Sequence, residues 1–241
     1  MEPRDAARLF VYDAAADTVT FDTFRSLAKY LPERSLMVLN NTRVLPARLW
    51  LTKETGGKIE VFVLANEMEN ESRVPVLLDR KASVGQRLRF PNGDALEIIE
   101  QRENIFFVRL ANLSGKTLFE LLQTYGTMPL PPYLRDASAS EKNLRVRYQT
   151  VFARAGASVA APTAALHFTD DVFRSLDEKG IERATVMLDV GLGTFAPLRE
   201  ENFVTGKLHP EYVEVTLATA EKINAAKQKR KKIIAVGTTV T

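Results

Sequence analysis

His167 is the residue of this sequence best suited to acid–base chemistry near neutral pH, because an ordinary imidazole titrates in that range. It stands in residues 161–169, Ala-Pro-Thr-Ala-Ala-Leu-His-Phe-Thr, a run of small residues that leads into a predicted helix. Small residues ahead of a helix N-terminus leave concave space near backbone N–H groups, so His167 could act there as acid or base. The alternative is a histidine that only ties down the loop.

A glycine-rich loop follows a predicted strand at residues 191–196, Gly-Leu-Gly-Thr-Phe-Ala. Its spacing fits the G-x-G-x-x-G/A fingerprint, which works because a helix begins at the loop and points its N-terminus at phosphates. Here Pro197 follows at once and residues 198–209 show no helical period, which argues against that fingerprint. We expect a loop whose backbone approaches a ligand closely, with a simple tight turn as the alternative.

Two arginines and a tyrosine could bind anions or bases. Arg43 and Arg48 lie on either side of Pro46 near the end of a predicted strand, and guanidinium forks suit carboxylate or phosphate groups. An arginine pair at a strand end is also a common structural clamp, so both interpretations stay open. Tyr133 follows two prolines and offers either a rigid face for a base to stack on or packing at a domain junction.

The middle of the chain predicts a separate β module. From about residue 48 to 110, short β-rich runs alternate with turn signals at a spacing typical of a small barrel or sandwich. The strands predicted there are Ile59–Leu64, Val74–Leu78, Arg87–Phe90, Leu96–Ile99 and Ile105–Leu110.

The flanking segments have α/β character. They predict strands at Leu9–Tyr12, Val19–Phe21, Leu36–Leu39, Ala184–Val190, Tyr212–Thr216 and Ile233–Val236, and helices at Phe24–Leu31, Lys116–Tyr125, Asp170–Lys179 and Leu217–Lys229. We therefore expect a main α/β (α+β) domain made of residues 1–50 and 112–241, with an all-β domain of residues 51–111 inserted into it. Because the last predicted strand lies so near Thr241, we expect the main domain to be short at its C-terminal end.

The composition narrows the class of protein. The 241 residues include 33 Lys and Arg, 30 Asp and Glu, two His and no Cys, and 45% are hydrophobic, which excludes disorder as the main state. The lack of cysteine excludes disulfides and thiolate catalysis, and with two histidines we expect no metal. No apolar run approaches the ~18 residues of a membrane span, and the charged first residues are unlike a signal peptide, so we expect a cytoplasmic protein.

Six ordered motifs carry a resemblance to a known family. They are Asn-Thr-Arg-Val-Leu-Pro-Ala-Arg-Leu at 41–49, Thr-Gly-Gly-Lys-Ile-Glu-Val at 55–61, Tyr-Gly with Pro-Leu-Pro-Pro-Tyr within 125–133, Arg-Tyr-Gln-Thr-Val-Phe-Ala at 147–153, the run 161–169, and Val-Gly-Leu-Gly-Thr-Phe at 190–195. Their order and spacing closely resemble the S-adenosylmethionine:tRNA ribosyltransferase-isomerase family of queuosine biosynthesis, over essentially the whole chain.

The resemblance implies an enzyme that transfers and isomerises the ribosyl unit of S-adenosylmethionine. The acceptor would be 7-aminomethyl-7-deazaguanine at the wobble position of a tRNA anticodon, and the products would be epoxyqueuosine in tRNA, adenine and methionine. It also implies an α/β main domain with a barrel-like mixed sheet and a smaller inserted β-barrel, S-adenosylmethionine as co-substrate without a metal, the tRNA anticodon stem-loop as partner, and a monomer.

The resemblance also assigns residues to roles. His167, Asp189 and Arg48 are the expected catalytic residues, with His167 as the base that removes a proton from the ribose carbon next to the sulfonium. The expected cofactor-binding residues are Thr163, Gly191, Gly193, Thr194, Phe195 and Arg43, and the expected substrate-binding residues are Tyr133, Arg147 and Tyr148. Replacing His167 with alanine is expected to abolish ribosyl transfer and leave the fold intact.

The sequence departs from the family pattern at three places. Asp189 stands where the family usually has histidine, Ala165 stands where it usually has glycine, and family members continue beyond the Val-Gly-Thr-Thr-Val segment at 236–240. These departures support an alternative, a non-catalytic tRNA-binding paralog. An unrelated methyltransferase is a second alternative, and the context of the glycine loop argues against it.

Overall fold

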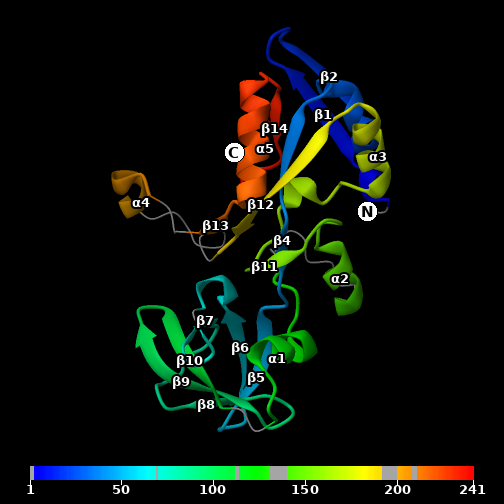
Figure 1. The fold of residues 1–241 in the computed structure, drawn as a ribbon. Helices are drawn as coiled ribbons and strands as arrows, with labels where there is room; N and C mark the ends of the chain where they lie inside the picture. Colours follow the sequence, from blue (N-terminus) through cyan, green and yellow to red (C-terminus); the bar gives the residue numbers. More distant parts are fainter. Residues whose placement is uncertain (1–2, 69, 112–113, 131–139, 192–199, 208–210) are drawn as a thin grey trace.

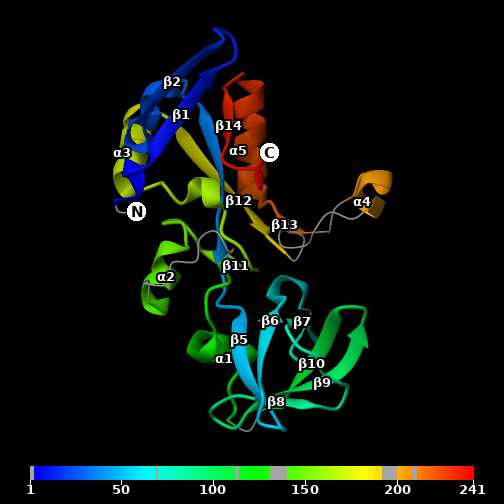
Figure 2. The same ribbon diagram turned by 180° about the vertical axis from the view of Figure 1, so that it is seen from behind.

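The fold was analysed in a computed structural model (Figure 1), which describes residues 3–68, 70–111, 114–130, 140–191, 200–207 and 211–241. Figure 1 shows a β-barrel at one end of the molecule and a sheet flanked by helices at the other, with β4 and β11 between them. The view from behind in Figure 2 shows the same arrangement.

The barrel is a closed sheet of six antiparallel strands in the order β10-β7-β6-β5-β8-β9. Its strands are β5 (Arg48–Lys53), β6 (Lys58–Val63), β7 (Val74–Leu78), β8 (Arg87–Arg89), β9 (Ala95–Arg102) and β10 (Ile105–Ala111). The predicted small β-barrel is confirmed, and each strand predicted between residues 59 and 110 corresponds to one of these. That residues 51–111 form an independent domain stays a prediction.

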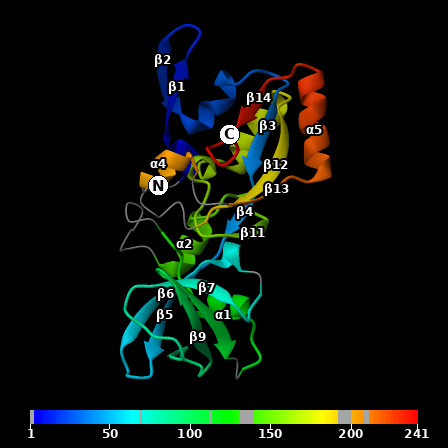
Figure 3. The ribbon, with the colours of Figure 1, turned by 90° about the vertical axis from the view of Figure 1, so that its left-hand side faces the viewer.

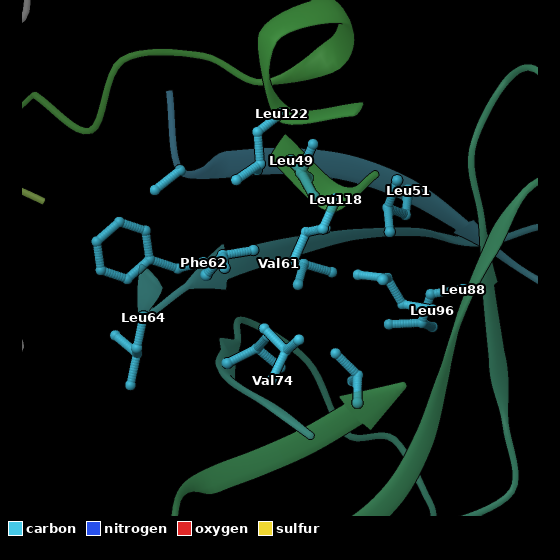
Figure 4. Close-up of a cluster of buried hydrophobic side chains, with 14 of the residues drawn as sticks. Leu49, Leu51, Val61, Phe62, Leu64, Val74, Leu88, Leu96, Leu118 and Leu122 are labelled. Atoms are coloured by element: carbon cyan, nitrogen blue, oxygen red, sulfur yellow. The ribbon is translucent and has the colours of Figure 1, made fainter. Parts of the chain in front are cut away.

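Alternating apolar residues fill the barrel because successive side chains of a strand point to opposite faces. On β6, Ile59, Val61 and Val63 are fully buried, and Leu49 and Leu51 of β5 meet them in the same cluster (Figure 4). The helix α1 (Leu118–Tyr125) adds further leucines to this core. Its first turn is held by a capping box in which the Thr117 side chain accepts from the Glu120 N–H and the Glu120 carboxylate accepts from the Thr117 N–H.

The second region is built on a four-stranded mixed sheet in the order β13-β12-β3-β14. Its strands are β3 (Leu36–Asn40), β12 (Glu182–Asp189), β13 (Tyr212–Glu214) and β14 (Ile233–Ala235); β12 and β14 run parallel to β3, and β13 is antiparallel to β12.

Strand β3 is buried on both faces, as is typical of a central parallel strand covered by helices. Met37 and Leu39 pack on the side of α3 (Asp170–Glu178), and Leu36 and Val38 pack on the side of α5 (Leu217–Gln228). The α3 helix is capped by Thr169, whose side chain accepts a hydrogen bond from the Val172 N–H.

The remaining elements belong to neither the barrel nor the mixed sheet. They are the hairpin β1 (Arg8–Asp13) and β2 (Thr18–Thr23), the parallel pair β4 (Thr42–Val44) and β11 (Ala155–Ser158), the helices α2 (Glu141–Arg147) and α4 (Glu200–Thr205), and the 3₁₀ helices Arg4–Ala6, Phe24–Tyr30, Ala65–Glu67 and Thr163–Ala165. Figure 3 shows β4 and β11 between the mixed sheet and the barrel.

Two predictions differ from the structure, and the strands β4 and β11 were missed. The segment predicted as a helix at Phe24–Leu31 is a 3₁₀ helix over Phe24–Tyr30. The prediction of no helix at residues 198–209 is wrong, because α4 occupies Glu200–Thr205; six residues are too few to show a helical period. Strands β4 and β11 were not predicted, because such short segments become strands through pairing between distant parts of the chain.

The predicted barrel-like shape of the main-domain sheet stays a prediction. In the described residues outside the barrel, the strands form the four-stranded mixed sheet and two two-stranded sheets.

Candidate functional site

The candidate site lies where the parallel strands β3 and β12 end. Ligands of parallel sheets bind outside the carboxyl ends of the strands, since the chain leaves the sheet there in loops. Asn40 is the last residue of β3 and Asp189 the last of β12, and both side chains are buried. We call Asn40, Thr42, Asp189 and Gly191 the strand-end site.

The Asn40 side chain fastens the two strand ends together. Its Nδ2 donates to the Leu188 carbonyl at 2.9 Å, and its Oδ1 accepts from the N–H groups of Leu188 at 3.1 Å and Thr42 at 3.0 Å. A buried amide satisfied in this way holds backbone groups that strand pairing no longer reaches. The chain therefore leaves β3 in a defined direction and enters β4 two residues later.

Both oxygens of Asp189 accept hydrogen bonds from the protein. Oδ1 accepts from the Thr42 hydroxyl in a short contact, and Oδ2 accepts from the Ala157 N–H at 3.0 Å. Gly156 lies against this carboxylate with φ +102°, and a Cβ there would lie 2.3 Å from Oδ1. Asp189 thus joins β12, β4 and β11, and these contacts suit a residue that positions the strand ends.

Gly191, the first residue of the predicted cofactor loop, lies against the 3₁₀ helix that follows β6. Its N–H donates to Glu211 Oε1 at 3.1 Å, and a Cβ on Gly191 would lie 2.6 Å from Asn66 Nδ2. Asn66 belongs to the 3₁₀ helix Ala65–Glu67, directly after β6 of the barrel. Only glycine fits at position 191 without displacing the Asn66 amide.

His167 is half-buried and held by the N-terminal segment. Its Nδ1 lies 3.1 Å from the Arg4 carbonyl oxygen, and its ring packs at 5.5 Å between centroids against Phe24. Because a carbonyl oxygen can only accept a hydrogen bond, this contact assigns the proton to Nδ1 and leaves the lone pair on Nε2. Thr163, in the 3₁₀ helix before His167, is exposed.

The two predicted acid–base residues make their hydrogen bonds to different segments. His167 bonds to Arg4 near the N-terminus, whereas Asp189 bonds to Thr42 of β4 and Ala157 of β11. The structure therefore joins Asp189 with Thr42 and leaves His167 on a separate set of contacts.

Arg43 and Arg48 differ in their surroundings. Arg48 of β5 forms a short ion pair with Glu60 on the neighbouring strand, with side chains 21% and 20% exposed, and its guanidinium lies 5.5 Å from the centre of the Phe62 ring. These contacts correspond to the structural clamp, and a catalytic role for Arg48 stays a prediction. Arg43 is exposed on β4 and lines a cavity with Arg4 and Arg145.

The predicted substrate-binding residues fall in three different settings. Tyr148 is 4% exposed and packs with Val44, Met128 and Leu130. Arg147 is half-buried at the end of α2. Four of the predicted site residues lie outside the described residues: Tyr133, Gly193, Thr194 and Phe195. The roles assigned to all of these stay predictions.

Sequence reasoning missed several residues around the site. The Gln149 side chain forms two hydrogen bonds with the backbone of Val44, at 2.6 and 3.1 Å, and the Arg4 guanidinium donates to the carbonyls of Gln149 and Val146 at 2.6 and 2.7 Å. Gln149 stands within one of the six motifs, but Arg4 and Asn66 carry no signal, because their partners are more than a hundred residues away in the chain.

Among the described residues, no group of three or more His, Cys, Asp or Glu side chains could hold a metal ion. In the same part of the chain, no helix is long and apolar enough to cross a membrane.

Comparison with known proteins identifies the family. The model of a family described as queuosine biosynthesis protein matches residues 1–241. The chain belongs to this family. It is 42% identical over 242 residues to the S-adenosylmethionine:tRNA ribosyltransferase-isomerase of Carboxydothermus hydrogenoformans, covering 100% of this chain and 70% of that relative. The protein of the same name from Clostridioides difficile is 41% identical over 242 residues, covering 99% of this chain and 69% of the relative.

The resemblance inferred from the six motifs is therefore confirmed, and the comparisons favour an enzyme of queuosine biosynthesis over a non-catalytic paralog. The chain spans about 70% of the length of these curated relatives. A crystal structure of an S-adenosylmethionine tRNA ribosyltransferase from Thermotoga maritima is 22% identical with a TM-score of 0.39, covering 98% of this chain and 63% of that one. Similarity at this level carries no argument about the fold.

Proposed function

We propose that this chain transfers and isomerises the ribosyl unit of S-adenosylmethionine onto 7-aminomethyl-7-deazaguanine in the tRNA anticodon, giving epoxyqueuosine. The observation that carries the proposal is the match to one family over residues 1–241, with relatives at about 40% identity that are named S-adenosylmethionine:tRNA ribosyltransferase-isomerase. We further propose a cytoplasmic monomer whose partner is the tRNA anticodon stem-loop.

The reaction replaces both leaving groups on the ribosyl unit. The bond from the sulfonium sulfur to the ribosyl carbon breaks and leaves its electron pair on methionine, and the bond from the ribosyl unit to adenine breaks and leaves its pair on the base. The lone pair of the aminomethyl nitrogen forms the new bond to the five-carbon unit, and an oxygen already present in that unit closes the epoxide. One proton leaves the amine and one leaves the ribose carbon; adenine takes up one, and the other is released. A base must accept the proton that leaves the ribose carbon next to the sulfonium.

His167 is the proposed base. The Arg4 carbonyl holds the proton on Nδ1, so Nε2 is the basic nitrogen in the neutral ring. Contact with Phe24 restricts the orientation of the imidazole. Fixing the tautomer through the second ring nitrogen is how proteins prepare a histidine to accept a proton.

The strand-end site is proposed to position the S-adenosylmethionine loop. Asp189, which the resemblance assigns to catalysis, would act here by holding β4 and β11 through its two accepted hydrogen bonds. Gly191 would let the loop backbone approach the adenosyl group, together with Gly193, Thr194 and Phe195. Thr163 would contact the same ligand from the exposed turn before His167.

The deciding experiment follows both halves of S-adenosylmethionine. The 241-residue chain is incubated with tRNA that carries 7-aminomethyl-7-deazaguanine and with S-adenosylmethionine labelled either in the ribosyl unit or in the methyl group. We expect ribosyl label in tRNA, with equal amounts of free adenine and methionine, and methyl label only in methionine.

Two other results would overturn the proposal. Methyl label in RNA would indicate a methyltransferase. Binding of both substrates without release of adenine would indicate a non-catalytic tRNA-binding protein. Unmodified tRNA is the matched control, since it lacks the acceptor nitrogen.

A further inference from the structure

A cavity of about 290 Å³ lies beside α2 and β4, apart from the residues of the strand-end site. Its walls include Arg4, Arg43, Arg145, Gln149 and Thr150, which we call the arginine cavity. No carboxylate lines it among the residues that the structure describes. Guanidinium groups around one small space favour an anionic ligand. Arg145 is already ion-paired with Glu141, so Arg43 is the main candidate to bind such a ligand.

Two of these arginines are held in place by the backbone. The Arg4 guanidinium donates to the carbonyls of Gln149 at 2.6 Å and Val146 at 2.7 Å. Arg145 donates to the Gln123 carbonyl at 2.7 Å and to the Glu141 carboxylate at 3.1 Å. The two carbonyl acceptors hold the Arg4 guanidinium in one orientation, so little conformational entropy is lost when an anion binds beside it.

Arg43 is the arginine that still has all its donors available. It is exposed on β4 between two buried residues, Thr42 and Val44, because side chains alternate along a strand. Within the described part of the chain it makes no hydrogen bond or ion pair. A guanidinium presents five N–H groups in a fixed fork, which matches the oxygens of a phosphate.

Thr150 gives an independent sign of a ligand. The residue is 5% exposed, and its hydroxyl oxygen is buried without a hydrogen-bond partner among the described residues. A buried hydroxyl without a partner costs free energy that a bound acceptor would recover. Thr150 lines the same cavity as the three arginines.

The arginine cavity has apolar residues at its rim and lies near the proposed base. Val146 and Val151 line the cavity and are 67% and 50% exposed, so apolar surface is available beside the cations for a sugar or a base. The backbone of Arg4 holds His167, so the cavity and the proposed base share one residue.

We propose that the arginine cavity binds a backbone phosphate of the substrate RNA, with Arg43 and Thr150 as its direct contacts. The proposal rests on the proposed function, in which tRNA is the substrate. The carboxylate of S-adenosylmethionine is the other anion of matching chemistry, and the experiment separates the two.

The test measures the affinity of the full chain for tRNA at several salt concentrations, without turnover. Arg43→Gln should weaken tRNA binding severalfold and make the slope of log affinity against log salt shallower by about 0.7 to 1, the effect of one lost phosphate contact. Arg89→Gln is the matched control, since Arg89 is also an exposed arginine but lies on β8 of the barrel. It should leave both quantities within error.

Thr150→Val keeps the shape of the side chain and removes the hydroxyl. It should weaken tRNA binding severalfold while the temperature of unfolding stays the same or rises, because an unpaired buried hydroxyl is gone. Thr150→Ser should restore tRNA affinity. The unfolding measurement separates a lost contact from a lost fold.

Three results would overturn the proposal. If Arg43→Gln or Thr150→Val binds tRNA with the affinity of the wild type, the cavity does not bind a phosphate of the RNA. An unchanged tRNA affinity combined with weaker S-adenosylmethionine binding assigns the cavity to the carboxylate. Failure of the proposed function is seen separately, as a wild-type chain that binds tRNA but releases no adenine.

Discussion

In the barrel, most strands pair with a neighbour in sequence, whereas the strand-end site joins segments near residues 40, 156 and 190. The barrel is held by a continuous apolar cluster. The strand-end site is held by polar side chains that bond to backbone groups of distant segments.

This difference has an energetic consequence. The free energy gained by burying apolar side chains is roughly proportional to the buried area and does not require one particular partner residue. The barrel therefore tolerates substitutions that keep the side-chain volume. A buried polar pair behaves otherwise, because removing one member leaves the other unsatisfied. We therefore expect the barrel to tolerate substitutions that keep volume, whereas single substitutions at the strand-end site should destabilise the protein and displace the loop that follows.

The largest expected effect is the loss of activity on replacing His167, and it tests whether the catalytic residues lie outside the barrel. His167→Gln removes the base, and His167→Asn also removes it but can still donate to the Arg4 carbonyl from its amide, as Nδ1 does. Both variants should lose about 100- to 10,000-fold in the rate of adenine release. Initial rates and urea unfolding of each variant check this. Wild-type turnover in His167→Asn would show that the histidine only ties down the loop.

The barrel side of the comparison is tested by Leu49→Ala. Leu49 is fully buried in the barrel core, so the change should lower the free energy of unfolding by about 2–5 kcal/mol. Urea unfolding followed by circular dichroism measures it. Val84→Ala, at a valine that is 58% exposed, is the control and should change stability by less than about 0.5 kcal/mol. Equal losses in the two variants would contradict the account of the core.

Contact between the two regions is tested at Gly191 and Asn66. Gly191→Ala should destabilise the protein by about 1–3 kcal/mol, because the new methyl group would meet Asn66 Nδ2 at 2.6 Å. Adding Asn66→Ala should relieve most of that loss, because it removes the opposing amide. A double-mutant cycle from urea unfolding gives the coupling energy. Strictly additive losses would mean that the loop and the barrel do not meet there.

The smallest expected effect is a dependence on pH at Asp5, beside Arg4. The Arg25 guanidinium donates hydrogen bonds to Asp5 and holds the pKa of that carboxyl below its usual range, against the opposing effect of burial. A depressed folded-state pKa stabilises the protein above the unfolded value of about 3.9 and loses that stability as the pH falls through the folded value.

Asp5→Asn should therefore cost about 1 kcal/mol from pH 7 down to about pH 5, and the difference from wild type should shrink below about pH 4. Urea unfolding across this range measures the difference. A gap that stays constant down to pH 2 would contradict an electrostatic origin.

The sequence predicted the elements whose own residues carry a pattern. Strands β6 to β10 of the barrel and the helices α1, α3 and α5 follow from apolar spacing and turn signals within each segment. The strands β4 and β11 could not be predicted, because their pairing joins residues more than a hundred positions apart. The roles of Arg4 and Asn66 could not be predicted for the same reason, since each side chain meets its partners only after the chain has folded.

The sequence by itself determined the family, through six motifs that are identified by their residue types and order alone, and it predicted the β-barrel. The tertiary structure decided how the motif residues are used. Arg48 forms an ion pair with Glu60, and Arg43 lines a cavity. Asp189 accepts hydrogen bonds from Thr42 of β4 and Ala157 of β11. The order of residues along the chain shows which side chains are present. Hydrogen bonds and interactions between charges depend on distances between atoms, and only the folded chain defines those distances.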